Sequence, residues 1–339
     1  MKIAFFDSKT YDINSFKTFE KDHSFKFFDT RLTIDTVYLA NGYDAVCVFV
    51  NDTVNKQVID KLVEYNVKLI LLRCAGYNNV DLEYCYGKIH VFRVPAYSPY
   101  AVAEHTIALL LTLVRKIHKA YIRTRNFNFN IENLQGFDLH GKTIGIIGTG
   151  KIGKVFIDIC KGFGMKVIAY DMYPSEGINY VSLDELFNQA DIISLHCPLT
   201  KETHHIINKN NISKMKKNPI ILNTSRGGLI NTKDLIDAIK SRTISGACLD
   251  VYEEESNIFF KDYSSEIIED DVLLELIAMP NVIVTSHQAY LTNEALNNIA
   301  STTMDNINDY INNGFGNNEL CYGCGKAEEC MKNRNIKCF

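Results

Sequence analysis

Residues 143–171 read TIGIIGTGKIGKVFIDICKGFGMKVIAYD, and this stretch decides the fold. Its G-x-G-x-x-G pattern, formed by Gly148, Gly150 and Gly153, follows an apolar, strand-like run and opens a helical pattern. In a βαβ unit the first glycine permits a tight turn, the second lets the backbone approach a pyrophosphate, and the third allows close packing of helix and strand. The N–H groups at the start of the helix then face the phosphates. The stretch therefore predicts a Rossmann unit that binds a dinucleotide.

The second strand of this unit ends at Asp171, near the separation of about 20 residues at which dinucleotide-binding proteins carry an acidic residue. Its carboxylate would accept hydrogen bonds from the adenosine ribose hydroxyls and would repel a 2′-phosphate. The next residues, Met172 to Pro174, include no arginine or lysine that would bind such a phosphate. The cofactor is therefore predicted to be NAD and not NADP.

Further βα patterns lie on both sides of this unit, and a chain of 339 residues is long enough for two domains. Strands are expected in an N-terminal series at 2–7, 45–50, 68–73 and 90–95, and in a second series from Gly141 to about residue 290. Their apolar runs are continuous, as is typical of parallel strands buried on both faces. We therefore predict two α/β domains with doubly wound parallel sheets.

Two long helical patterns complete the organisation. The first begins near Pro99 and is expected to run to about Arg123, with an apolar stripe made of Ala103, Ile107, Leu110, Leu111 and Val114. Such a stripe either packs inside its own domain or forms a subunit interface, and the sequence leaves both open. The second pattern covers residues 293–313, and its periodicity does not indicate which domain it joins.

Composition and charge are those of an ordinary globular protein. Hydrophobic residues make up 46% of the chain, charged residues 22%, and the formal net charge is −4. No basic surface is indicated, so neither nucleic acid nor a membrane is an expected partner. No signal-peptide pattern opens the sequence, and six of the ten cysteines lie scattered in apolar runs. We therefore expect a soluble cytoplasmic protein whose scattered cysteines are buried.

Three polar side chains, Arg226, Glu255 and His287, follow predicted strands of the second series, where an open sheet places its ligands. Reduction of a 2-keto acid needs a cation that holds the carboxylate, and arginine binds carboxylates bidentately while keeping its charge. It also needs an acid that protonates the carbonyl oxygen, and histidine titrates near neutral pH. A neighbouring glutamate would favour the protonated imidazole. Together the three residues predict hydride chemistry on a small 2-keto acid.

Longer motifs give the chain a resemblance to a known family. They are LRCAGYNNVD (72–81), VPAYSPYAVAEHT (94–106), GKTIGIIGTGKIG (141–153), LHCPLT (195–200), NTSRGGLI (223–230), LDVYEEE (249–255) and HQAYLT (287–292). Over residues 1–318 the sequence resembles the D-isomer-specific 2-hydroxyacid dehydrogenases, and the first two motifs and the last are typical of the D-lactate branch. The resemblance implies NAD-dependent interconversion of pyruvate and D-lactate, with bulkier 2-keto acids as the alternative substrates. A third hypothesis is an NADH-sensing corepressor of the same fold, which the intact catalytic set disfavours.

The resemblance also implies roles for individual residues. Arg226 would bind the substrate carboxylate and polarise the carbonyl group. His287, held and kept charged by Glu255, would be the acid in reduction and the base in oxidation. Backbone amides around Ala75 and Gly76 would bind the carboxylate from the other domain.

Tyr97 and Tyr290 would line the substrate site and narrow it. The residues expected to contact NAD or support its binding are Gly148, Gly150, Lys151, Ile152, Gly153, Asp171, Cys197, Pro198, Thr203, Thr224 and Asp250.

The resemblance further implies a Rossmann NAD-binding domain inserted in a flavodoxin-like substrate domain. Residues 100–291 would form the NAD-binding domain, and residues 1–99 and 292–339 the discontinuous substrate (catalytic) domain. The protein would be a homodimer or homotetramer with the long helix after Pro99 at the interface.

The C-terminal tail departs from the family pattern. It carries the four remaining cysteines, Cys321, Cys324, Cys330 and Cys338. A C-x₂-C pair followed by two cysteines could bind zinc, but the gap between the second and third is not a standard finger spacing. A flexible, oxidisable tail is the favoured interpretation, and no metal is expected in the catalytic set. The adjacent pair His204 and His205 is interpreted as part of a turn or helix.

Overall fold

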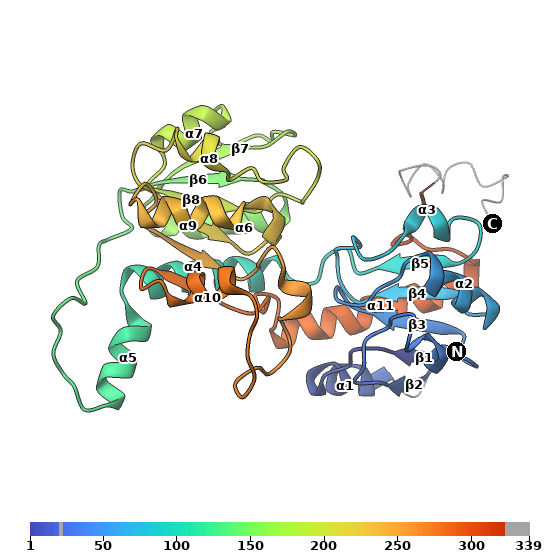
Figure 1. Cartoon of the computed structure of the whole chain (residues 1–339). Coiled ribbons are helices and arrows are strands. Elements are labelled where there is room, and N and C mark those ends of the chain that lie inside the picture. The colour runs from blue at the N-terminus through green and yellow to red at the C-terminus, as the bar shows by residue number, and fades with distance from the viewer. Residues whose placement is uncertain (20–22, 323–339) are drawn as a thin grey trace. The chain divides into compact units, whose positions relative to one another are not determined.

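The computed structural model describes residues 1–19 and 23–322 (Figure 1). The chain divides into two compact units: a terminal unit, Met1–Ser98 with Leu291–Phe339, and a central unit, Pro99–Tyr290. Each unit contains one parallel sheet with helices packed against it, so the prediction of two parallel-sheet α/β domains is confirmed.

The terminal unit has a five-stranded parallel sheet in the order β2-β1-β3-β4-β5, which is the order of doubly wound flavodoxin-like sheets. Its strands are β1 (Lys2–Phe5), β2 (Ser24–Phe27), β3 (Ala45–Val48), β4 (Leu69–Leu72) and β5 (His90–Arg93). Its helices are α1 (Thr10–Phe16), α2 (Lys56–Glu64), α3 (Leu82–Cys85) and α11 (Asn293–Asn313), with 3₁₀ turns at Lys17–Phe19 and Val37–Ala40.

Strand β2 is not among the strands that the sequence predicts. It lies at the edge of the sheet, pairs with β1, and has side chains that are half-buried or exposed. Its two aromatic residues, Phe25 and Phe27, stack with their ring centroids 5.9 Å apart. An edge strand of this kind lacks the continuous apolar run that identifies a central strand.

Helix α11 belongs to the terminal unit, although the whole central unit separates it in sequence from β5. It packs on α1, β4 and β5. The side chain of Thr292 caps its N-terminus by accepting a hydrogen bond from the N–H of Ala295, and the helix ends at Gly314 in a left-handed conformation. After this helix, the N–H of Leu320 donates to the carbonyl of Val91 at 2.7 Å, so the chain also pairs with β5 there.

The central unit has a six-stranded parallel sheet in the order β11-β10-β9-β8-β6-β7. At the edge of the sheet, Tyr180 forms a parallel bridge with Ala169 of β7, where a seventh strand would lie. Strand order reverses between β6 and β8, and an open α/β sheet binds its ligand at such a switch point. The strands are β6 (Thr143–Ile147), β7 (Lys166–Tyr170), β8 (Ile192–Leu195), β9 (Ile220–Asn223), β10 (Gly246–Leu249) and β11 (Val282–Val284).

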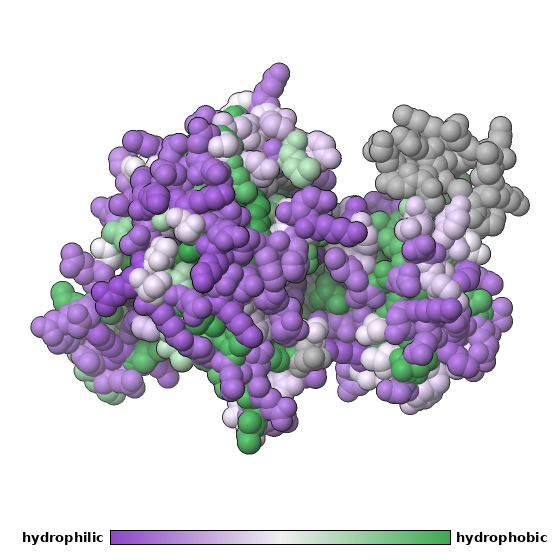
Figure 2. All heavy atoms as spheres, turned by 45° about the horizontal axis from the view of Figure 1, so that its top comes forward, coloured by the Kyte–Doolittle hydropathy of each residue, from purple (hydrophilic) through white to green (hydrophobic). Residues whose placement is uncertain are grey.

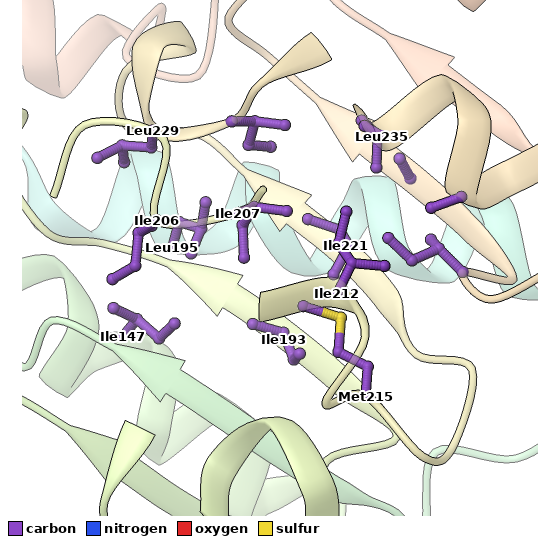
Figure 3. Packing of buried hydrophobic residues seen from close by; sticks show 14 of the residues in the cluster. Ile147, Ile193, Leu195, Ile206, Ile207, Ile212, Met215, Ile221, Leu229 and Leu235 are labelled. Carbon is purple, nitrogen blue, oxygen red and sulfur yellow. The ribbon is translucent and has the colours of Figure 1, made fainter. Parts of the chain in front are cut away.

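The helices of the central unit cover both faces of this sheet. They are α4 (Pro99–Val114), α5 (Ile117–Arg125), α6 (Lys151–Gly162), α7 (Leu183–Gln189), α8 (Lys209–Ile212), α9 (Thr232–Lys240) and α10 (Asp271–Ala278), with 3₁₀ turns at Gly227–Leu229 and Glu255–Asn257. On one face, Ile147, Ile193 and Ile221 of the strands meet Ile207 and Leu229 of the connecting segments (Figure 3). On the other face, the apolar stripe of α4 is buried with residues of α6, so its interpretation as core is confirmed.

The helix predicted from Pro99 to about Arg123 is divided in two, so that expectation is wrong in its second half. Lys116 has a φ of 52°, and this left-handed conformation separates α4 from α5. Large apolar side chains on α5 and the segment after it are exposed, namely Ile117, Tyr121, Ile122, Phe127, Phe129 and Ile131. Figure 1 shows α5 and this segment extending away from the six-stranded sheet.

Hydrophilic residues cover most of the visible surface of both units (Figure 2). Within the described residues, no helix has the length and apolarity required to cross a membrane. The six cysteines of the apolar runs are buried, as predicted. In the tail, Cys321 is half-buried, whereas Cys324, Cys330 and Cys338 lie outside the described residues.

Candidate active site

The glycine-rich turn after β6 has three distinct local geometries. Gly148 has a φ of 97°, which residues with side chains rarely adopt. Gly150 caps α6, and a Cβ built there would meet no atom within 4 Å. At Gly153 a Cβ would lie 2.2 Å from the carbonyl oxygen of Gly148, so only glycine permits this approach. Lys151 and Ile152 complete the first turn of α6, where unpaired N–H groups and the positive helix end suit an anionic pyrophosphate.

Asp171 stands at the C-terminal end of β7 and is tied to the glycine-rich turn. Its Oδ2 accepts hydrogen bonds from the N–H (2.6 Å) and hydroxyl (3.0 Å) of Thr149, and its Oδ1 accepts one from the N–H of Tyr173 (2.8 Å). Burial raises the pKa of Asp171, but these hydrogen bonds outweigh it and hold the pKa below its usual value. The carboxylate is therefore ionised at neutral pH, and its remaining lone pairs suit the ribose hydroxyls of NAD.

The backbone after β8 forms the other side of the switch point. A Cβ at Gly148 would lie 2.5 Å from the backbone nitrogen of Cys197, so the two loops are in contact. Cys197 is buried, and its carbonyl accepts a hydrogen bond from the hydroxyl of Ser225 at 2.7 Å. The loops after β6, β8 and β9 thus meet at one edge of the sheet.

Two predicted cofactor-site threonines have defined hydrogen bonds in these loops. The hydroxyl of Thr203 donates to the carbonyl of Pro198 at 2.7 Å. The hydroxyl of Thr224 lies 2.8 Å from that of Thr106 on α4. Both bonds hold the loop backbone against its neighbours.

His287 and Glu255 are in direct contact. Nδ1 of His287 lies 2.7 Å from Oε1 of Glu255, whose Oε2 accepts a hydrogen bond from the N–H of Tyr252 at 2.8 Å. A carboxylate accepts and does not donate, so Nδ1 carries the proton of this bond and Nε2 is left for a substrate. The two side chains are 14% and 18% exposed, so the pair is shielded from bulk water but remains accessible.

Arg226 follows β9 and directly precedes the 3₁₀ turn Gly227–Leu229. Its side chain is half-buried, and its Nη1 donates to the carbonyl of Ser225 at 2.6 Å. A Cβ at Gly227 would lie 2.1 Å from the carbonyl carbon of Tyr252, so this glycine packs on the chain just before Glu255. The loops that carry Arg226 and Glu255 are therefore packed together at the C-terminal ends of β9 and β10.

Asp250 is fully buried and organises the loop after β11. Its Oδ1 accepts hydrogen bonds from the hydroxyl of Thr285 (2.5 Å) and the N–H of Gln288 (3.0 Å), and its Oδ2 accepts one from the N–H of Ala289 (2.8 Å). His105 on α4 lies 3.5 Å from the same carboxylate. Burial raises the pKa of Asp250, but the bonds from these partners outweigh it and lower the pKa. The sequence does not indicate this contact, because a histidine on an apolar helix carries no signal of its partner.

The terminal unit carries three of the predicted substrate-site residues. Ala75 and Gly76 follow β4, and the carbonyl of Ala75 accepts a hydrogen bond from Nη1 of Arg93 at 3.1 Å. The carbonyl of Tyr97 accepts one from an asparagine of α11 at 2.6 Å. Tyr290 belongs to the central unit and is buried.

Comparison with known proteins identifies the family. Residues 107–289, more than half of the chain, match the family model described as "D-isomer specific 2-hydroxyacid dehydrogenase, NAD binding domain". The chain belongs to this family. Its central unit is thus the NAD-binding part of a D-2-hydroxyacid dehydrogenase, and the glycine-rich turn and Asp171 fit that cofactor.

Relatives of this dehydrogenase match it over nearly their whole length. A 2-hydroxyacid dehydrogenase homolog of Haemophilus influenzae is 49% identical over 91% of this chain and 95% of its own. The D-lactate dehydrogenase of Escherichia coli is 47% identical over 94% of this chain and 100% of its own. A solved structure described as the pyruvate reductase of Chlamydomonas reinhardtii has a TM-score of 0.87 and 43% identity, and the match covers 92% of this chain and 96% of that one.

Proposed function

We propose that this dehydrogenase interconverts pyruvate and D-lactate with NADH and NAD⁺. The proposal rests on the 2.7 Å hydrogen bond between His287 and Glu255, which lies at the same sheet edge as Arg226. A proton donor, its orienting carboxylate and a carboxylate-binding cation are the groups that reduction of a 2-keto acid needs. The names of the Escherichia coli and Chlamydomonas relatives support pyruvate as the substrate.

Bound NADH supplies the hydride that adds to the keto carbon. Arg226 binds the substrate carboxylate and polarises the carbonyl. The proton on Nε2 of His287 passes to the carbonyl oxygen and gives the hydroxyl group, and in the oxidation the neutral imidazole takes that proton back. Glu255 orients the ring through Nδ1 and stabilises its positive charge.

In this proposal residues 100–291 bind NAD, while residues 1–99 and 292–339 form the substrate domain. Backbone amides at Ala75 and Gly76 bind the substrate carboxylate, and Tyr97 and Tyr290 limit the size of the pocket. The residues assigned to NAD are Gly148, Gly150, Lys151, Ile152, Gly153, Asp171, Cys197, Pro198, Thr203, Thr224 and Asp250. A cytoplasmic location is also part of the proposal.

Substrate choice is tested by initial rates of NADH oxidation with pyruvate, 2-ketobutyrate, phenylpyruvate and 2-ketoisocaproate. One methylene changes selectivity by only about 1–3 kcal/mol, so the full series is needed. We expect the highest kcat/KM with pyruvate, a product that is D-lactate by chiral analysis, and little turnover with NADPH. A preference for the larger acids would replace the proposal with a broader D-2-hydroxyacid dehydrogenase, and L-lactate as product would overturn it.

We also propose that the protein is a homodimer formed through α5 and the segment that follows it, with a homotetramer as the alternative. Phe127 and Phe129 are 85% and 74% exposed there, and large apolar patches of this kind mark protein interfaces. Light scattering is expected to give twice the 38.5 kDa chain mass. Phe129→Asp should yield monomers, whereas Tyr38→Asp, at an exposed aromatic of the terminal unit, should not. A dimer that survives Phe129→Asp would contradict this interface.

A further inference from the structure

Outside the proposed catalytic set, His204, His205 and Glu253 form a compact cluster in the central unit. Each offers one ligand atom, and these atoms all lie within 4.8 Å of one another. His204 is exposed, and the other two side chains are 25% exposed each, so the cluster opens to solvent. Nothing in the proposed hydride transfer uses these three side chains.

Backbone conformation brings the two histidines to the same side. Side chains of successive residues in extended chain point in opposite directions. His205, however, has a φ of 52°, and the two imidazole rings lie with their centroids 3.8 Å apart. The turn is held by hydrogen bonds from the N–H of His205 to the carbonyl of Gly228 (2.9 Å) and from Nδ2 of Asn208 to the carbonyl of His205 (2.7 Å). This left-handed conformation places both imidazole rings on one side of the turn.

Both carboxylate oxygens of Glu253 have hydrogen-bond partners that hold the side chain in place. Its Oε1 lies 2.5 Å from Nε2 of His205. Its Oε2 accepts hydrogen bonds from the N–H (3.3 Å) and hydroxyl (3.1 Å) of Thr232, at the N-terminus of α9. Support of a carboxylate ligand through its second oxygen is typical of metal sites.

We propose that His204, His205 and Glu253 bind one divalent transition-metal ion of the Zn²⁺ class. Zinc takes imidazole nitrogen and carboxylate oxygen at about 2.0–2.2 Å in a tetrahedron, which places the ligand atoms roughly 3.4 Å apart. To reach that spacing the 2.5 Å contact between His205 and Glu253 must widen by about 0.9 Å, and the exposed ring of His204 must turn toward them. The ion replaces the proton between His205 and Glu253, and water completes the fourth position.

The ion cross-links the loop after β8 to the loop after β10. Because it binds the folded chain, metal should raise the thermal midpoint of the protein. Glu253 is two residues from Glu255, and its backbone nitrogen is one of the atoms on which Gly227 packs. The metal site therefore lies beside the loops of the proposed active site without sharing their reacting groups.

The test is titration of the full-length, metal-free protein with Zn²⁺, followed by thermal unfolding, and with Co²⁺, followed by absorption. The background has Cys321, Cys324, Cys330 and Cys338 changed to serine, so that tail thiols cannot bind the metal. We expect one ion per chain, a higher thermal midpoint, and a tetrahedral Co²⁺ spectrum without thiolate charge-transfer bands.

Matched variants locate the ion. His204→Ala and Glu253→Gln should each weaken binding at least about tenfold, as should Thr232→Val, which removes the hydroxyl that supports Glu253. His140→Ala changes an exposed histidine elsewhere in the central unit and should leave binding unchanged. Circular dichroism of each metal-free variant checks its fold. The proposal is overturned if no ion binds in this serine background, or if folded His204→Ala and Glu253→Gln bind as tightly as the parent.

Discussion

Asp250 binds the backbone at His287 and at the two residues that follow it. The N–H of His287 donates to the carbonyl of Asp250 at 2.6 Å, and the N–H groups of Gln288 and Ala289 donate to its carboxylate at 3.0 and 2.8 Å. His287 has a φ of 53°, so these bonds hold the histidine in a conformation that is otherwise unfavourable. The position of the imidazole thus depends on a buried residue that carries out no chemistry itself.

Asp250→Asn should therefore reduce both stability and turnover. An amide offers one acceptor oxygen where the carboxylate offers two, so one buried donor loses its partner at a cost of about 1–3 kcal/mol. Urea unfolding and kcat with pyruvate measure the two effects. Asp158→Asn, at an exposed carboxylate of α6, is the matched control. Equal stability of Asp250→Asn and the wild type would show that the network is dispensable.

His287→Gln should lower kcat by about 10²–10⁴-fold, because general acid–base catalysis contributes that much. Binding of NADH, measured by fluorescence, should be nearly unchanged. If Glu255 acts through His287, the double variant His287→Gln/Glu255→Gln should be no slower than His287→Gln alone. A fully additive double variant would indicate an independent role for Glu255, and near-normal turnover of His287→Gln would rule out the proposed acid.

Gly150→Ala should weaken NADH binding, whereas Gly153→Ala should disturb the packing of the helix. A Cβ at Gly150 meets no protein atom within 4 Å, so the alanine variant should fold normally yet bind NADH more weakly, since the methyl occupies space proposed for the pyrophosphate. At Gly153 a Cβ would lie 2.2 Å from a backbone oxygen, and the helix must shift. Thermal unfolding and NADH titration of both variants separate the two effects. Tight NADH binding by Gly150→Ala would contradict the proposed phosphate position.

Asp171→Asn should relax the choice of cofactor. The carboxylate of Asp171 would repel the 2′-phosphate of NADPH, and adjacent like charges cost on the order of several kcal/mol. We expect the ratio of kcat/KM for NADPH to that for NADH to rise at least about tenfold. Asparagine keeps one acceptor oxygen for Thr149, and the N–H of Tyr173, whose bond to Asp171 is exposed, can bond to water instead, so the loop should remain in place. An unchanged ratio would show that another residue excludes the phosphate.

His196 should make the protein sensitive to mild acid. Desolvation lowers the pKa of His196 to about 3 in the folded chain, against about 6.5 in the unfolded chain. Below pH 6.5 the unfolded chain gains a proton that the folded chain does not. The free energy of unfolding therefore falls as the pH is lowered, by up to about 1.4 kcal/mol per pH unit. His196→Gln should flatten this dependence in urea unfolding as the pH is lowered from about 7 to about 4, the range in which only the unfolded chain is protonated at this residue. Parallel curves for the two proteins would contradict the assignment.

Much of the fold is readable from the sequence because its signals are local. The continuous apolar runs of β1, β3 and β4 and of the central sheet indicate buried parallel strands without knowledge of their neighbours. The helix over 293–313 is as predicted, since its periodicity lies within a single segment. The edge strand β2 has no such run, and the turn at Lys116 has no glycine or proline to mark it, so both differ from expectation.

The sequence by itself determined the glycine spacing after β6, the acidic residue at the end of β7, and the presence of Arg226, Glu255 and His287 after strands. Only the tertiary structure decided which of these side chains touch, and which residues support them. Three contacts join segments far apart in the chain: the 2.7 Å bond of His287 with Glu255, the 3.5 Å approach of His105 to Asp250, and the cluster of His204, His205 and Glu253. Such contacts depend on the packing of separate loops at one sheet edge, and a pattern within one segment carries no information about them.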